Sequence, residues 1–181
     1  MRFLRRFFQL TVLTAALGLG MLALYQYKFP APRPPEPLPP LTGQIDHILI
    51  EKGARRLTVF RDGVELRSYP VALGFAPEGD KARQGDGRTP EGMFRIDRRN
   101  AESKFHLSLG INYPQRDDLI RASAGGYDPG GDIFIHGQPN AFYGKATLRH
   151  DWTAGCIAVS DTEIEELWRV TPMGTTVEIR P

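Results

Sequence analysis

The sequence has only one cysteine, Cys156, among its 181 residues. A single cysteine cannot form an intramolecular disulfide, so a disulfide framework does not hold this chain together. Two interpretations of Cys156 remain. It is either a small apolar residue of the core, as free cysteines usually are, or a nucleophile.

Closely spaced metal ligands are also missing. No two histidines have the H-x-x-x-H spacing, and the cysteine belongs to no C-x-x-C pair. Zinc sites usually contain such pairs, so we expect no metal ion. The histidines are His47, His106, His136 and His150.

Signals for phosphate and nucleic-acid binding are weak. Residues 85–88 read Gly-Asp-Gly-Arg but lack the G-x-x-x-x-G-K-[ST] pattern of a phosphate-binding loop. The formal net charge of +2 is small, so nothing indicates a nucleic-acid partner.

The N-terminal segment joins a basic start to a long uncharged stretch. Residues 1–6 contain three arginines, and residues 7–27 carry no charge and are rich in leucine. About twenty apolar residues cross a bilayer, and basic residues ahead of them keep the N-terminus in the cytoplasm. We therefore expect residues 7–27 to be an uncleaved signal anchor, a transmembrane helix that holds the chain on the periplasmic side of the inner membrane. A cleaved signal peptide, which would release the chain into the periplasm, is the alternative.

Residues 28–43 are expected to form a linker, because residues 30–40 read PAPRPPEPLPP. Such a run favours extended polyproline II and acts as a semi-rigid spacer. Residues 44–181 then have the length of one domain with a single core.

This domain is expected to be mostly β. Short runs rich in β-branched and aromatic residues recur between glycine and proline, and Asp62-Gly63 is a hairpin turn signal. The expected strands cover residues 45–50, 56–60, 64–73, 93–96, 105–111, 132–136 and 176–179.

One helix is predicted after Ser160, because Ser160 and Glu163 have the spacing of a capping box. Ile164 and Leu167 then fall on one helical face. A second helix is predicted over residues 117–124.

Cys156 follows Gly155 and lies downstream of His136, which ends an apolar run. A thiol nucleophile needs a base that removes its proton and backbone N–H groups that bind the oxyanion. His136 is the best-placed base in the sequence.

Four blocks occur in a fixed order: residues 72–74, 85–94, 105–114 and 131–137. Thr153-Ala154-Gly155-Cys156 follows, with sixteen residues between His136 and Thr153. In these blocks the chain resembles the L,D-transpeptidase catalytic domain family, of the YkuD type, over roughly residues 45–180. The resemblance is strongest to the subgroup with the motif Asp-Trp-Thr-x-Gly-Cys-Ile-Ala-Val.

The resemblance implies a β-rich α+β fold, a sandwich-like arrangement of sheets with one or two helices. It makes Cys156 the nucleophile, His136 the general base, and the backbone carbonyl of Gly137 the group that orients the histidine ring. The N–H groups of Gly155 and Cys156 would form the oxyanion hole, and no metal or organic cofactor is required. We also expect His136 and the helix start near Ser160 to lower the pKa of the Cys156 thiol.

The implied substrates are peptidoglycan stem peptides, which a thioester intermediate would pass to an amine or to water. Ala154 and Ala158 stand where many members carry larger residues, so the acceptor and the balance of transfer against hydrolysis stay open. The alternatives are an amidase or L,D-carboxypeptidase on the same scaffold, and a non-catalytic peptidoglycan-binding module. The oligomeric state is not indicated.

Five further residues are candidates for substrate binding. Arg88 either supports a turn or binds a substrate carboxylate. His106 and His150 lie in or near the motif blocks, where they line either the cleft or the ordinary surface. Tyr113 fills either the core or a peptide-binding wall, and Thr153 belongs to the cysteine motif.

Overall fold

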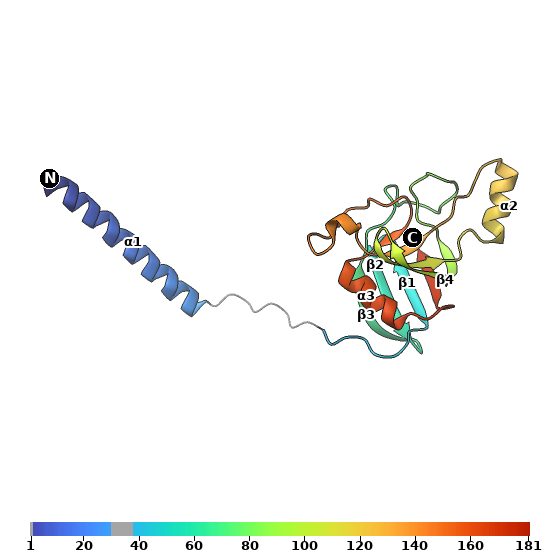
Figure 1. The fold of residues 1–181 in the computed structure, drawn as a ribbon, viewed down its shortest axis with the longest axis horizontal. Coiled ribbons are helices and arrows are strands. Elements are labelled where there is room, and N and C mark those ends of the chain that lie inside the picture. The colour runs from blue at the N-terminus through green and yellow to red at the C-terminus, as the bar shows by residue number, and fades with distance from the viewer. Residues whose placement is uncertain (1, 30–37) are drawn as a thin grey trace. The chain divides into compact units, whose positions relative to one another are not determined.

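The computed structural model describes residues 2–29 and 38–181, with the side chains of the first helix described at residue 12 and from residue 14 onward (Figure 1). The chain divides into two compact units, Met1–Pro39 and Pro40–Pro181. The first contains helix α1, Arg2–Lys28.

Within the described part of the chain, no helix is both long and apolar enough to cross a membrane. The structure therefore does not support the expected transmembrane helix over residues 7–27, although this stretch is helical. The side chains of residues 7–11 and 13, and residues 30–37 of the expected linker, lie outside the described residues.

The second unit is built on an eight-stranded sheet with the order β3-β2-β1-β8-β4-β5-β6-β7. The expectation of a mostly β fold is confirmed. The strands are β1 (His47–Glu51), β2 (Arg56–Arg61), β3 (Val64–Pro70), β4 (Gly92–Ser103), β5 (His106–Ile111), β6 (Phe134–His136), β7 (Ile157–Ala158) and β8 (Thr176–Arg180).

Alternation along the strands decides which side chains form the core. In β1, Ile48 and Ile50 are fully buried, whereas the residues between and beside them are half-buried. This is the period-two pattern of a strand with one face on the core. The β2–β3 hairpin turns through Asp62 and Gly63, both of which have positive φ angles of 51° and 75°.

Strand β4 joins the two halves of the sheet. Its first residues, Gly92 to Arg95, pair with β8, and the residues from Ile96 onward pair with β5. One strand, β4, is therefore shared by two groups of strands: β1, β2, β3 and β8 on one side, and β5, β6 and β7 on the other.

The two edges of this sheet also meet. Ala72, just beyond β3, exchanges two backbone hydrogen bonds of 2.9 and 2.8 Å with Ala158 of β7. The short strand β7 is thus held on one side by β6 and on the other by the segment that follows β3.

Helix α3 (Asp161–Val170) packs against β5 and β6 through buried Ile164, Leu167 and Val170. Its predicted capping box is confirmed, since Ser160 Oγ accepts a hydrogen bond from the Glu163 N–H and Glu163 Oε2 accepts one from the Ser160 N–H. Helix α2 (Arg116–Gly125) covers the predicted second helix and projects away from the strands (Figure 1). A short 3-10 turn, η1, covers Asn140–Phe142.

Candidate active site

The site residues lie on β6 and directly before β7, which are parallel neighbours. His136 is opposite Ala158, and Ile135 is opposite Ile157. Cys156 precedes Ala158 by two residues, so the strand alternation places its side chain on the same face of the sheet as His136. The fold therefore brings the two residues to neighbouring segments, with Cys156 two residues before Ala158, the partner of His136.

The His136 ring is enclosed by aromatic side chains. It stacks on Phe105, with ring centroids 4.6 Å apart, and meets the ring of Trp152 edge-on at 5.7 Å. The residue is only 2% exposed. Burial lowers the pKa of His136 to about 4, and the hydrogen bond to the Gly137 carbonyl opposes this only in part. At neutral pH the imidazole is therefore uncharged and able to accept a proton.

The orientation of the ring follows from one contact. His136 Nδ1 lies 2.7 Å from the carbonyl oxygen of Gly137. Because a carbonyl oxygen can only accept, Nδ1 carries the hydrogen in the neutral ring and Nε2 keeps its lone pair. The geometry thus leaves Nε2 as the basic atom.

Cys156 carries a protonated thiol in this arrangement. Its Sγ donates a hydrogen bond of 3.4 Å to the carbonyl oxygen of Asp132. Burial raises the pKa of the Cys156 thiol, the backbone of Phe134 opposes that shift, and the nearby Asp132 carboxylate adds to it. The expectation of a lowered thiol pKa is wrong, because an uncharged His136 provides no positive charge to offset desolvation.

The turn that carries Cys156 is closed by the buried hydroxyl of Thr153. It donates to the Cys156 carbonyl at 2.7 Å and accepts from the Gly155 N–H at 3.1 Å. One of the two expected oxyanion donors, the Gly155 N–H, is therefore already engaged. Among residues 38–181, which the structure describes, the Cys156 N–H has no hydrogen-bond acceptor, which makes it the available donor.

Residues 85–88 lie in close contact with the turn that carries Cys156 and with Gly74. A Cβ on Gly155, whose φ is +138°, would lie 2.6 Å from the Arg88 carbonyl, and one on Gly74 would lie 2.0 Å from the Gly87 carbonyl. The contribution of Arg88 at this turn is therefore its backbone. Its exposed side chain donates to the Asp80 carbonyl at 3.3 Å.

The Asp86 carboxylate holds the loop of residues 81–88 together through hydrogen bonds. It accepts hydrogen bonds from the ammonium of Lys81, at 2.8 Å, and from the N–H groups of Ala82, Arg83 and Arg88. Burial opposes ionisation, but these bonds outweigh it and lower the pKa of Asp86 to about 2. The loop that supports the cysteine turn therefore keeps its carboxylate charged over the ordinary pH range.

The other predicted binding residues are dispersed. His106 has a positive φ of 65°, and its Nε2 lies 2.9 Å from Glu165 Oε1. Tyr113 is buried in the core and its hydroxyl donates to the Pro129 carbonyl at 3.0 Å, so it does not form a peptide-binding wall. His150 is exposed.

Residues not predicted for the site are Phe105, Trp152, Gln138 and Asp161. The Gln138 N–H donates to Asp161 Oδ1 at 2.8 Å. The Gln138 side chain, 1% exposed, donates to the Val159 carbonyl at 2.6 Å and accepts from the Leu148 N–H at 2.8 Å. Phe105 and Trp152 belong to the motif blocks, which was the available signal, whereas Gln138 and Asp161 become visible only through tertiary contacts.

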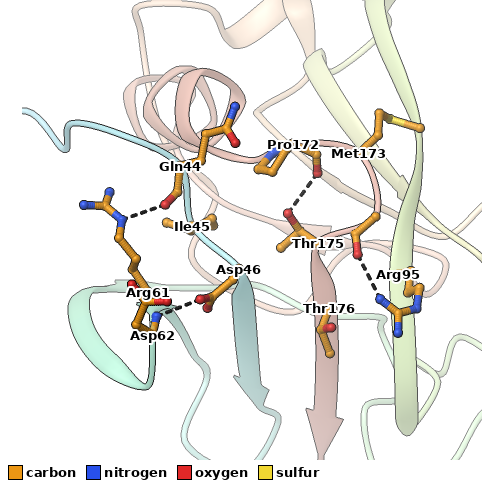
Figure 2. Close-up of a pocket in the computed structure, with 11 residues that line it drawn as sticks. Gln44, Ile45, Asp46, Arg61, Asp62, Arg95, Pro172, Met173, Thr175 and Thr176 are labelled. Carbon is orange, nitrogen blue, oxygen red and sulfur yellow. Dashed lines mark hydrogen bonds between the residues drawn. The ribbon is translucent and has the colours of Figure 1, made fainter.

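A separate polar hollow of about 510 Å³ lies where β1 and β8 begin (Figure 2). Arg61 and Arg95 approach it from different strands, and their guanidinium groups are directed to the backbone carbonyls of Gln44 and Gly174. None of the predicted site residues lines this hollow.

The chain is similar to known proteins of one family. The model of the L,D-transpeptidase catalytic domain (YkuD) matches residues 45–179. YafK of Escherichia coli strain K12, which is named as a candidate L,D-transpeptidase, is 26% identical over 135 residues, covering 71% of this chain and 48% of YafK. The chain thus spans about half the length of the curated relatives that it matches.

Solved structures with a similar fold point to the same family. The helical cell shape determining protein Pgp2 of Campylobacter jejuni is similar with a TM-score of 0.61 and 25% identity, over 76% of this chain and 48% of Pgp2. Bd1075 of Bdellovibrio bacteriovorus shares the fold with a TM-score of 0.55 and 24% identity, over 76% of this chain and 48% of Bd1075. The chain belongs to the L,D-transpeptidase catalytic domain family.

Proposed function

We propose that the chain is a cysteine-dependent L,D-transpeptidase that acts on peptidoglycan stem peptides in the periplasm. The observation that carries this proposal is the placement of Cys156 and His136 on one face of adjacent parallel strands, with His136 Nδ1 bound to the Gly137 carbonyl. Cys156 is the free cysteine of the described chain, and its backbone N–H has no acceptor there.

In the first half-reaction, His136 Nε2 takes the proton of Cys156 as the sulfur attacks the carbonyl carbon of the donor amide. The Cys156 N–H stabilises the oxyanion. When the carbon–nitrogen bond breaks, His136 returns the proton to the leaving amine. A D-amino acid departs, and the stem peptide remains as a thioester on Cys156.

In the second half-reaction, an amine or water attacks the thioester. His136 takes the proton of the attacking group, and the sulfur leaves as a thiol after proton return. An amine acceptor gives a transferred or cross-linked peptide, and water gives a shortened one. The protonated thiol at rest fits a base that acts during attack rather than a preformed ion pair.

Reaction products test the proposal. The full chain and its Cys156→Ala variant are incubated with disaccharide-tetrapeptide and a D-amino acid, followed by mass spectrometry of the peptides and of the intact protein. We expect exchanged or cross-linked peptides, and an acyl adduct on the wild-type protein alone. An unmodified cysteine and unchanged peptides in both samples would contradict the proposal.

A hydrolase on the same scaffold is the second candidate, because the small residues Ala154 and Ala158 beside the nucleophile leave the acceptor undetermined. Tripeptide as the only product would identify an L,D-carboxypeptidase, and release of a linked group would identify an amidase. A non-catalytic peptidoglycan-binding module would bind purified cell wall without forming an acyl adduct.

The name of Pgp2 refers to helical cell shape. By analogy, we propose that this chain contributes to cell-wall remodelling and cell shape. Loss of the protein should then change cell morphology, and the Cys156→Ala variant should fail to restore it.

A further inference from the structure

A chain of contacts links the first residue of helix α3 to the catalytic histidine. Asp161 Oδ1 accepts a hydrogen bond of 2.8 Å from the Gln138 N–H. This N–H belongs to the same peptide unit as the Gly137 carbonyl, which lies 2.7 Å from His136 Nδ1. A carboxylate, one peptide group and the imidazole are therefore connected in series.

The glycine at position 137 makes this series possible. A Cβ there would lie 2.7 Å from Asp161 Oδ1, 3.0 Å from Ile164 Cγ2 and 3.1 Å from the Phe105 carbonyl. Any side chain would push α3 away from the peptide. The glycine that follows the histidine thus allows the carboxylate to reach the peptide group.

The hydrogen bond from the peptide N–H to the Asp161 carboxylate affects the chemistry of His136, because it polarises the peptide group between them. A peptide N–H that donates to a carboxylate makes its own carbonyl oxygen a stronger acceptor, because connected hydrogen bonds reinforce one another at low dielectric. A stronger acceptor at Nδ1 fixes the ring tautomer. It also stabilises the imidazolium that forms when Nε2 takes the thiol proton, as a carboxylate does when it contacts the histidine directly.

We propose that Asp161 is a positioning residue that acts on His136 through the Gly137–Gln138 peptide. The inference rests on the proposed function. Asp161 takes the place of the side-chain carboxylate of a Cys-His-Asp triad, with one peptide group inserted between carboxylate and imidazole. The other charged groups beside Asp161 are Glu163, on the same helical turn, and Lys145, which lines a surface hollow with it. On the side of His136 itself, the strand register places Cys156 two residues before Ala158, the partner of His136.

Capping of the helix does not account for the contact. Ser160 and Glu163 already form the capping box of α3. Glu163 has a charge on the same first turn but bonds to the Ser160 N–H, so it offers a matched control. Substitution at either position removes one negative charge near the helix N-terminus, and only substitution at Asp161 breaks the connection to His136.

The kinetic test compares Asp161→Asn, Asp161→Ala and Glu163→Gln in the full chain. We expect kcat for stem-peptide turnover to fall about 10-fold in Asp161→Asn and further in Asp161→Ala, with KM changed less than about 2-fold. Glu163→Gln should keep kcat near the wild-type value. Equal losses in the Asp161 and Glu163 variants, or a loss confined to KM, would overturn the proposal.

A substrate-free test uses the ring nitrogens of His136, observed by ¹⁵N NMR in the wild-type protein and the same variants. We expect wild type and Glu163→Gln to hold the tautomer with hydrogen on Nδ1, and Asp161→Ala to populate both tautomers. Thermal denaturation checks that each variant is folded, and Asp161→Asn, which keeps an oxygen acceptor, provides a milder variant than Asp161→Ala. An unchanged tautomer in a folded Asp161→Ala protein would overturn the proposal. If wild type fails to turn over stem peptides, the proposed function fails, whereas the NMR comparison still decides the role of Asp161.

Discussion

The hydroxyl of Thr153 donates a hydrogen bond of 2.7 Å to the carbonyl oxygen of Cys156, three residues further along the chain. The hydroxyl oxygen of Thr153 in turn accepts a hydrogen bond of 3.1 Å from the Gly155 N–H. These two bonds close the turn that carries Cys156, whose own N–H has no acceptor among the described residues. Thr153, a candidate for substrate contact, therefore serves the turn itself.

Replacement of Thr153 by valine should keep the shape of the side chain and remove both bonds. Because the residue is 4% exposed, a carbonyl and an N–H would lose their partner in the interior, at a cost of about 1–3 kcal/mol in the free energy of unfolding. We expect acylation of Cys156 to slow as well. Thr153→Ser, which keeps the hydroxyl, is the control, and equal behaviour of the two variants in urea unfolding and acylation assays would contradict this role.

His136 should make stability depend on pH. Its pKa is about 4 in the folded chain against 6.5 for the ordinary side chain, so the unfolded chain binds a proton at higher pH. The stabilising contribution is therefore complete above pH 6.5 and is lost as the pH falls towards 4, by about 3 kcal/mol in total. Urea unfolding between pH 7 and pH 4 should show a steeper loss for wild type than for His136→Gln. Parallel curves would show that the folded pKa is not lowered.

The Cys156 thiol should alkylate slowly at neutral pH. Burial raises its pKa, so the rate of reaction with iodoacetamide should rise with a midpoint above that of a free cysteine, about 8.5. A short peptide containing one cysteine provides the reference. A midpoint below the reference would instead indicate a resting thiolate–imidazolium pair.

Gly137→Ala should be destabilising. The new methyl group would lie within 3.1 Å of Asp161, Ile164 and the Phe105 carbonyl, and overpacking of this kind costs about 1–3 kcal/mol. The matched control is Gly53→Ala, whose methyl would be no closer than 3.7 Å to its neighbours and should change stability by less than about 0.5 kcal/mol. Comparison of midpoints in thermal denaturation would distinguish the two.

The sequence predicted those helices and turns that have a recognisable signal in their own residues. The capping box placed the start of α3, and Asp62-Gly63 placed the β2–β3 turn. Strand β4 runs to Ser103, well beyond the predicted residues 93–96, because its second half is polar and is held by pairing with β5 rather than by burial. Strand β7 has two residues and exists only through its partners, so no local signal could reveal it.

The candidate site shows the same difference between features with a local sequence signal and features that depend on tertiary contacts. Cys156 and His136 could be selected from their residue types and spacing, whereas the pKa values depend on burial that only the folded chain creates. Tyr113 illustrates the limit, since an aromatic residue in a motif block fits a core or a groove equally well until its surroundings are known. Asp161 lies in a recognisable helix start, yet its contact with the peptide after His136 depends on how α3 packs.

The closure between Ala72 and Ala158 has a consequence for how the segment around Cys156 is held in the fold. The nucleophile follows most of the sheet in the chain, and its strand is secured partly by a residue from the first half of the domain. The segment that carries Cys156 is therefore held in place only when two parts of the chain that are distant in the sequence have come together. The position of Cys156 thus depends on the meeting of the two edges of the sheet and not on its local turn alone.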